Sequence, residues 1–337
     1  MQPNQPIPPT PLPALPHSWS ELTWQQLCDC WQVKLRYGGN PDVARAAALI
    51  ALLQCKIQKS KFKIENDEQT GERLFRMSPS SRDCPDRICT AREIAHHAGT
   101  ALKWYDFPYG DPGEKEQQDE SGNVVKERRE GVRGYVSNMK DAMILPLTET
   151  EVGGLPFALP QAACSNLTWE QYRALQLLTP QLFADGITEE QTLDLQAQFL
   201  AHCLVPAQDA AQTADKFGAK HVFKYDSLRA ERTVPFWKMQ MPSCPTLFHI
   251  CFQVYQTALT YYETVYPLLF GGGGKRDPLQ DALTGEAATI DAIMMKAHYA
   301  SQQEVYDTNL PFILDILNTM AKEAKEIEKM NAKIKKK

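Results

Sequence analysis

Four residues in the first third of the chain have side chains that could hold a metal ion. Cys84 and Cys89 are separated by four residues, and His96 and His97 follow on a predicted helix. Thiolates and imidazoles are the ligands of structural zinc, but such sites usually combine two closely spaced pairs. Adjacent histidines also point in different directions on a helix. The spacing therefore favours ordinary thiols and surface histidines over a zinc site.

Two other groups could in principle bind phosphate or carry out acid–base chemistry. Gly271–Gly274 precede Lys275 and Arg276, but the run lacks the Gly-x4-Gly-Lys-Ser/Thr spacing of a phosphate-binding loop. His249 and Glu263 lie on one predicted helix, about 21 Å apart along its axis, too far to act together. No Gly-x-Ser-x-Gly element marks a nucleophile. We therefore expect no enzymatic activity, no catalytic residues, no bound metal and no cofactor.

The composition is that of a folded protein without a strong electrostatic preference. The length of 337 residues indicates about two domains. There are 41 acidic and 36 basic residues, and the net charge of −5 therefore shows no excess of basic residues of the kind that binds nucleic acid. The nine cysteines are odd in number and no secretory signal precedes them, which favours free thiols in a reducing cytosol. We expect no membrane segment.

The most regular helical pattern runs from Thr246 to Phe270. A stripe of polar residues divides two apolar rows along this segment: His249, Gln253, Gln256, Thr260 and Glu263. A helix that is apolar over most of its circumference must be buried, and the polar stripe argues against a membrane span. We therefore predict that this segment is the central helix of a helical domain. It is expected to end near Pro267 and the glycine run that follows.

The fold class predicted for the whole chain is mainly α, with helical domains and a small β-hairpin in the N-terminal half. The expected domains are a proline-rich arm (1–16), an N-terminal α+β domain (17–152), a helical domain (153–308) and a projecting C-terminal helix (309–337). Gly153–Pro160 is interpreted as the linker between the two larger domains. In the N-terminal domain, residues 111–131 form an acidic insertion that we expect to be a solvated loop or a disordered segment, with Ser121–Gly122–Asn123 as a candidate turn.

The hairpin is placed by a polar turn between two short apolar runs. Lys61–Ile64 and Arg73–Met77 are the expected strands, and Asp67–Gly71 is the expected turn.

Helix starts are indicated by Thr followed three residues later by Gln or Glu, the capping-box pattern. It occurs at Thr23, Thr90 and Thr188. In addition, the order Leu-Thr-Trp that begins at Leu22 recurs at Leu167, each time shortly before a Gln and after a proline-rich entry. The match is short. An ancient duplication would explain the match, and so would the preference of many helix N-termini for the same residue types.

The C-terminal segment, Asn309–Lys337, reads as one long helix. Its first part is apolar on one face, whereas its second half keeps only a sparse apolar stripe among lysines and glutamates and should project from the domain. We expect a partner to bind the apolar residues of this helix: Phe312, Ile313, Ile316, Leu317, Met320 and Ile327. The basic end, which includes Lys335–Lys337, is typical of a solvated helix terminus.

The order of motifs in the second half resembles a known group of proteins. The motifs are LTWEQY, LDLQAQFLAHCL, FKYDSLRAERTVP, the aromatic helix HICFQVYQTALTYYETVYPLLFGGGG and the closing run from ATIDAIMM to LNTMAKEAKE. This succession, over about Leu155–Glu328, resembles uncharacterised tail-region proteins of Bacteroidetes phages and prophages, which are encoded beside the tape-measure protein. The N-terminal hairpin and the acidic insertion are not matched.

The resemblance implies a virion-assembly role, such as a tail-assembly chaperone or a minor structural protein, and brings no catalytic residues. The implied partner is a tail or tape-measure-type protein, with self-association as a further option, in the cytoplasm of the bacterial host or in the virion. The alternative is a nucleic-acid-associated regulatory protein that uses the basic C-terminal tail and the His96–His97 helix. An enzyme of unrecognised type is the weakest of the three.

Overall fold

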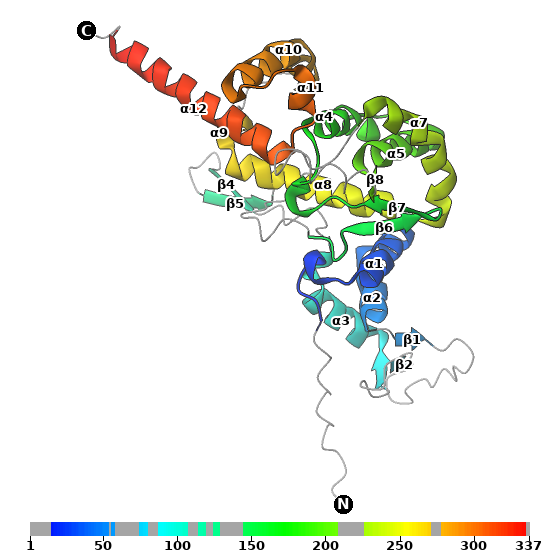
Figure 1. The fold of residues 1–337 in the computed structure, drawn as a ribbon. Coiled ribbons are helices and arrows are strands. Elements are labelled where there is room, and N and C mark those ends of the chain that lie inside the picture. Colours follow the sequence, from blue (N-terminus) through cyan, green and yellow to red (C-terminus); the bar gives the residue numbers. More distant parts are fainter. Residues whose placement is uncertain are drawn as a thin grey trace, which may run out of the picture. The chain divides into compact units, whose positions relative to one another are not determined.

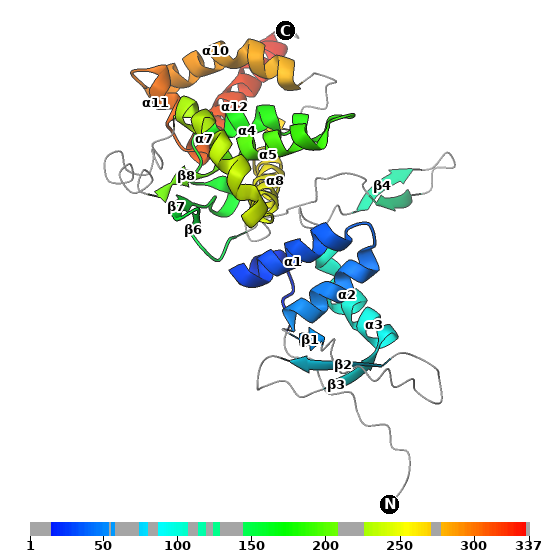
Figure 2. The same ribbon diagram turned by 90° about the vertical axis from the view of Figure 1, so that its right-hand side faces the viewer.

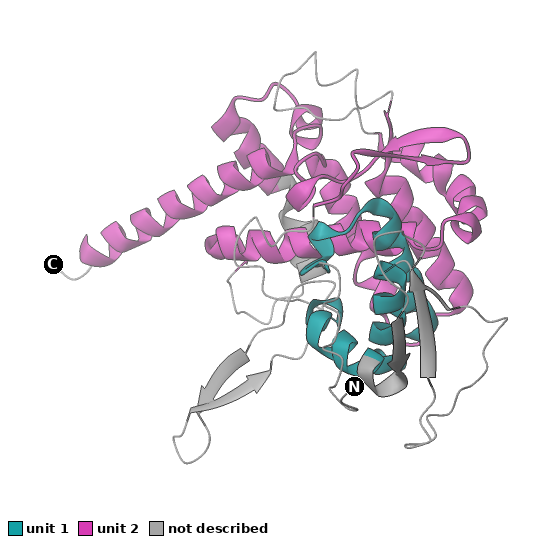
Figure 3. Ribbon diagram, turned by 90° about the horizontal axis from the view of Figure 1, so that it is seen from below, with its two compact units in different colours: residues 1–108 teal, residues 109–337 magenta. Residues whose placement is uncertain are grey.

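The computed structural model describes residues 15–53, 55–57, 74–79, 87–106, 114–118, 124–128, 144–207, 226–270 and 278–334 (Figures 1 and 2). The chain divides into two compact units, Met1–Pro108 and Tyr109–Lys337 (Figure 3). The described part is mainly helical, as predicted, with small antiparallel sheets.

The described part of the first unit contains helices on one short antiparallel sheet of order β1-β2-β3. The elements are η1 (Trp19–Glu21), α1 (Trp24–Tyr37), α2 (Pro41–Leu52), β1 (Cys55–Ile57), β2 (Leu74–Pro79), β3 (Arg87–Thr90), α3 (Ala91–Ala101) and η2 (Lys103–Asp106). The predicted capping box at Thr23 and Gln26 is confirmed at the start of α1. The buried face of α1 presents Leu27, Cys30 and Trp31 to the core.

A cluster of aromatic rings packs the two 3-10 turns, η1 and η2, against α1. The ring of Trp19 stacks on Tyr105 at 5.3 Å and meets Trp31 at 5.6 Å and Trp104 at 5.4 Å between centroids. The Trp19 indole N–H donates to the Trp104 carbonyl at 3.1 Å, and the Tyr105 hydroxyl donates to the Cys30 carbonyl at 3.0 Å. Large rings with satisfied polar tips therefore form the core of this unit.

The predicted N-terminal hairpin falls only partly on described residues. Strand β2 overlaps the second predicted strand, Arg73–Met77, and pairs with β1 on one side and β3 on the other. The first predicted strand, Lys61–Ile64, and the turn at Asp67–Gly71 lie outside the described residues. The predicted pairing of these two runs stays a prediction.

The second unit holds most of the helices. Its elements up to α5 are β4 (Glu114–Gln118), β5 (Val124–Arg128), β6 (Glu149–Val152), β7 (Leu155–Ala158), η3 (Ala162–Cys164), α4 (Trp169–Leu178), η4 (Gln181–Phe183) and α5 (Glu189–Cys203). After α5 come β8 (Val205–Pro206), α7 (Ser227–Gln240), η6 (Met241–Ser243), α8 (Leu247–Val265), α9 (Pro267–Phe270), α10 (Pro278–Ala297), α11 (Gln302–Tyr306) and α12 (Leu310–Ile334).

The segment that we interpreted as a linker, Gly153–Pro160, instead forms a hairpin turn and strand β7. Gly153 and Gly154 have φ angles of 59° and 78°, and they join β6 to β7, which also pairs with β8. Two consecutive residues with positive φ are the requirement of a type I′ hairpin turn, which glycine meets without strain. A side chain at Gly153 would come within 3.1 Å of Phe236 on α7. The Gly-Gly pair is thus a packed turn, not a flexible connection.

The acidic insertion, 111–131, also contains more structure than the solvated loop that we expected. Strands β4 and β5 pair as an antiparallel hairpin. Their register sets an acidic residue opposite a basic one at three consecutive positions: Glu114 with Arg128, Lys115 with Glu127, and Glu116 with Lys126. Opposite charges in facing positions favour strand pairing. The high charge that suggested a loop is therefore compatible with a hairpin.

Helix α8 runs through the core of the second unit, as the sequence predicted (Figure 1). The middle of its polar stripe is buried, with Gln253 at 0% exposure and Gln256 and Thr260 at 4% and 5%. The Tyr262 hydroxyl donates to the Ala163 carbonyl at 2.6 Å and ties α8 to η3. The helix ends at Val265, just before Pro267 as expected, and residues 267–270 form the separate short helix α9.

The start of α4 is the point where three helices of this unit are joined. Leu310 N–H donates to the Leu167 carbonyl and Trp169 N–H donates to the Thr308 carbonyl, both at 2.8 Å. Inside the same turn, Thr168 and Gln171 form a buried capping box. The Gln171 side chain also donates to the backbone carbonyl of His202, near the end of α5, at 2.9 Å. One turn therefore fastens α4 to both α12 and α5.

This geometry predicts that Gln171→Ala destabilises the protein far more than Gln191→Ala. Both glutamines close a capping box, but Gln171 is fully buried and Gln191 is exposed. The Gln171 variant leaves the Thr168 amide and the His202 carbonyl buried without partners, which costs about 3 kcal/mol. The Gln191 variant should cost about 0.5 kcal/mol. Urea unfolding of both variants measures the difference, and equal losses would contradict the joining role of this turn.

Candidate functional site

The six residues predicted to bind a partner lie along α12, but in different environments. Ile313 is fully buried in the core of its own unit, with 0% exposure, and is closed to a partner in this structure. Ile327 is exposed to 54%. The other four are half-buried: Phe312, Ile316, Leu317 and Met320. The first three turns of α12 therefore pack against the rest of the unit, and the apolar surface that a partner could reach begins after them.

The second half of α12 extends beyond the other helices of its unit (Figures 1 and 3). Three large apolar side chains on it are more exposed than buried: Ile327 at 54%, Met330 at 56% and Ile334 at 70%. Scattered single apolar residues are normal on a protein surface. Here Ile327 and Ile334 lie one heptad apart on one face of the helix, and Met330 lies at the edge of that face, so together they make an apolar stripe.

The stripe follows a heptad pattern that our reading of the sequence missed. The positions that continue the buried face alternate by steps of four and three: Ile313, Leu317, Met320, Ala324, Ile327, Asn331 and Ile334. This is the a/d spacing of a helix that packs lengthwise against another helix, and Asn331 falls at an a position. A single asparagine at such a position sets register and orientation in coiled coils. From the sequence we recognised the sparse apolar stripe of this half, which includes Ala324, but not its heptad spacing, because the polar Asn331 interrupts it.

Side-chain contacts hold α12 in place up to the point where the stripe becomes exposed. The Tyr266 hydroxyl donates to the Asp315 carboxylate at 2.6 Å. Two turns further along, Lys296 of α10 pairs with Glu323 at 2.6 Å. Together with the backbone bonds at Leu310, these contacts fix the direction in which the exposed half extends. The stripe is thus carried on a rigid element, as a binding surface requires.

The polar stripe of α8 is unsuited to acid–base chemistry. Burial lowers the pKa of His249 to about 4, so its imidazole is neutral at pH 7 and lies against the Phe248 ring at 5.1 Å. Glu263 lies near the other end of α8. No pair of facing acid and base results, and the stripe is best explained by packing between helices.

Three buried cysteines, Cys164, Cys203 and Cys251, gather where η3, α5 and α8 meet, and the pKa values of Cys164 and Cys251 are raised. A hydrogen bond with the Cys203 thiol and burial raise the pKa of Cys251 well above its usual value. Burial also raises the pKa of Cys164. The reactive form of cysteine is the thiolate, and its formation is disfavoured at Cys164 and Cys251. The side chains of Cys84 and Cys89 lie outside the described residues, and within the described residues no group of three potential ligands is placed to hold a metal.

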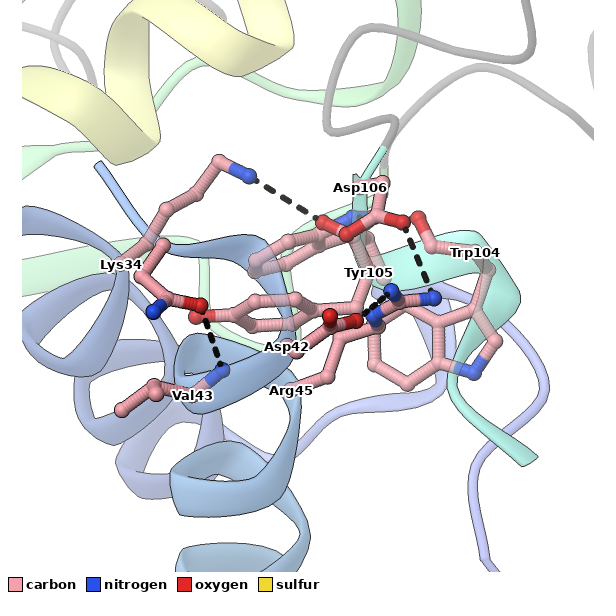
Figure 4. A network of polar contacts seen from close by, with 9 residues as sticks. Lys34, Asp42, Val43, Arg45, Trp104, Tyr105 and Asp106 are labelled. Carbon is pink, nitrogen blue, oxygen red and sulfur yellow. Dashed lines mark hydrogen bonds and ion pairs between the residues drawn. The ribbon is translucent and has the colours of Figure 1, made fainter. Parts of the chain in front are cut away.

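In the first unit, charged side chains fasten η2 to the helices (Figure 4). The Lys34 ammonium lies 4.9 Å above the Tyr105 ring and donates to the Tyr105 carbonyl at 3.3 Å. Arg45 of α2 pairs with Asp42 and, at 3.5 Å, with Asp106. Each charged group contacts a neighbour in its own unit, so the network holds η2 against the helices and has a structural role. It presents no nucleophile and no free base.

Comparison of the chain with protein-family models, curated proteins and solved structures finds no match. Among the helices of the described ranges, none combines the length and the apolar character needed to cross a membrane. Within the described residues, the exposed half of α12 is the candidate binding surface that the geometry supports best.

The low pKa of His249 predicts that the protein loses stability as the pH falls below 6.5. The unfolded state binds a proton near pH 6.5, whereas the folded state binds it only near pH 4. Between these values the unfolded state holds more protons, so stability rises with pH. From pH 7 to pH 5 the loss from this group is about 2 kcal/mol. Urea unfolding at both pH values, with His249→Gln as the comparison, should show a smaller pH-dependent loss in the variant.

Proposed function

We propose that this protein is a non-enzymatic assembly protein of a phage or prophage tail, and that it works by binding another protein through α12. The observation that carries the proposal is the exposed heptad stripe on a firmly anchored helix. The resemblance of Leu155–Glu328 to tail-region proteins supplies the biological setting. The protein would act in the cytoplasm of the bacterial host, or remain in the virion, with a tape-measure-type protein as its partner.

The geometry limits how a partner helix can lie on α12. At Ile313, Leu317 and Met320 the apolar face is occupied, fully or in part, by the protein's own unit, whereas from Ala324 to Ile334 its residues are exposed. A partner helix would therefore cover the last two heptads, burying Ile327 and Ile334 in its own apolar seam. A tape-measure-type protein, which is long and helical, has the form to supply such a seam.

The proposal predicts that the double variant Ile327→Gln, Ile334→Gln loses the partner. Glutamine keeps the helix propensity but removes the apolar seam, so capture of the co-expressed tape-measure-type protein should fall at least tenfold. The measurement is the amount of partner that co-purifies with the tagged protein. The thermal midpoint should stay within 2 °C, about the effect of a small surface change, because both side chains are exposed.

The matched control is the double variant Lys322→Gln, Lys329→Gln, which changes two exposed positions off the stripe of the same helix. It should bind as the unchanged protein does. Equal capture by the stripe variant and the control would show that α12 is not the contact. Failure of the unchanged protein to capture the partner would overturn the proposed tail-assembly function itself.

A further inference from the structure

The charged residues on the exposed half of α12 are sorted by their position around the helix. In the heptad that places Ile327 at d, all lysines of residues 322–333 lie at b, c or f, on the face away from the apolar stripe. Of the three glutamates in this range, Glu323 and Glu328 lie at g and e, directly beside the stripe. The charged residues that flank the stripe are therefore all acidic.

Of these two flanking carboxylates, Glu328 is the one left for a partner. Glu323 pairs with Lys296 of α10 at 2.6 Å. Glu328 is exposed, and within the described ranges of the chain it forms no ion pair. It follows directly on Ile327, whose side chain is 54% exposed. A helix that covered Ile327 would thus bring its own flanking residues next to a carboxylate that is not yet neutralised.

The geometry at the inner end of the stripe argues against a second copy of this chain as the occupant. The face that carries the stripe continues into the unit, where Ile313 is fully buried. A second α12 lying parallel and in register would have to place its own unit in the same space. In an antiparallel pair, a positions face d positions, and the d positions of α12 are apolar. Asn331 of each copy would then be covered by an apolar side chain without a hydrogen-bond partner.

We infer that the stripe takes an unlike helix, which has an apolar seam, lysine or arginine at the positions flanking that seam, and a hydrogen-bonding side chain where it faces Asn331. This inference rests on the part of the proposed function in which α12 binds a helix of another protein, and it names the chemistry of that helix. Flanking charges set partner choice between paired helices, and one polar a position sets their register. Glu328 selects the partner, because it attracts a basic flank and repels an acidic one.

The test uses two synthetic helical peptides and the full-length protein. Both peptides have a seam of isoleucine and leucine with one asparagine. One carries lysine at all flanking positions and the other carries glutamate, so that each peptide repels its own copies and stays monomeric. At low salt, fluorescence anisotropy should show about tenfold tighter binding of the lysine peptide. In about 1 M salt the preference should nearly vanish, because charges are then screened over about 3 Å.

Two charge-reversal variants of the protein locate the source of the preference. Glu328→Lys should weaken binding of the lysine peptide about fivefold and strengthen binding of the glutamate peptide. The matched control is Glu326→Lys, which makes the same change of charge at an exposed c position of the same helix. It should leave both affinities within about twofold. Circular dichroism checks that both variants keep their helix content. Equal effects of the two variants would show a general attraction between charges and would overturn the inference.

The remaining outcomes separate this inference from the proposed tail role. Preference for the lysine peptide without capture of the tape-measure-type protein would overturn the tail role and support the specificity of α12. Capture of that protein without a preference between the peptides would overturn the specificity alone, as would failure of both peptides to bind. A dimer of the free protein in sedimentation that Ile327→Gln abolishes would make a second copy the occupant and would also overturn the inference.

Discussion

The amide groups at the start of an α-helix have no partners within the helix, and at α4 they lie in the core of the protein. Water cannot reach Thr168 or Gln171, both at 0% exposure, so every polar group of this turn needs a partner from the chain. The partners come from three directions: the capping box itself, the end of α5 and the entry to α12. Satisfying one helix terminus thus dictates where two further helices lie.

The exposed half of α12 remains helical without that kind of support. Its composition of alanine, lysine and glutamate favours a helix locally, and opposite charges one turn apart, such as Lys322 and Glu326, add to this. The first half supplies the nucleus, which is the costly part of helix formation. The first half of α12 is packed and the second half has high helix propensity. Together these properties explain how an apolar stripe extends beyond the unit that supports it.

Much of the helical fold could be predicted from the sequence, because its signals are local. Thr23 and Thr188 each start a helix, as their spacing to a following glutamine indicated. The aromatic rows of α8 likewise required burial. Periodicity and capping chemistry act over four to seven residues, and such a range is visible in one sequence.

The strands and the site were harder to predict, because they depend on distant partners. Gly153 and Gly154 suit a linker or a tight turn equally well until the strands on both sides are known to pair. Ile313 and Ile327 belong to one heptad stripe, and only tertiary packing decides that the first is buried and the second exposed. Nor does the sequence show that the Leu-Thr-Trp motif at Leu167 pairs with Thr308–Leu310, since that segment lies about 140 residues further along the chain.

The backbone bridge at the start of α12 determines where a force applied to this helix would act. Tension applied along the helix by a bound protein would reach the hydrogen bonds that Leu167 and Trp169 make with Thr308–Leu310, without a flexible hinge in between. Through Gln171 the same turn would pass the load on to α5. A force on the exposed helix would therefore act on α4 and α5, which lie inside the unit, and not only on the surface that carries α12.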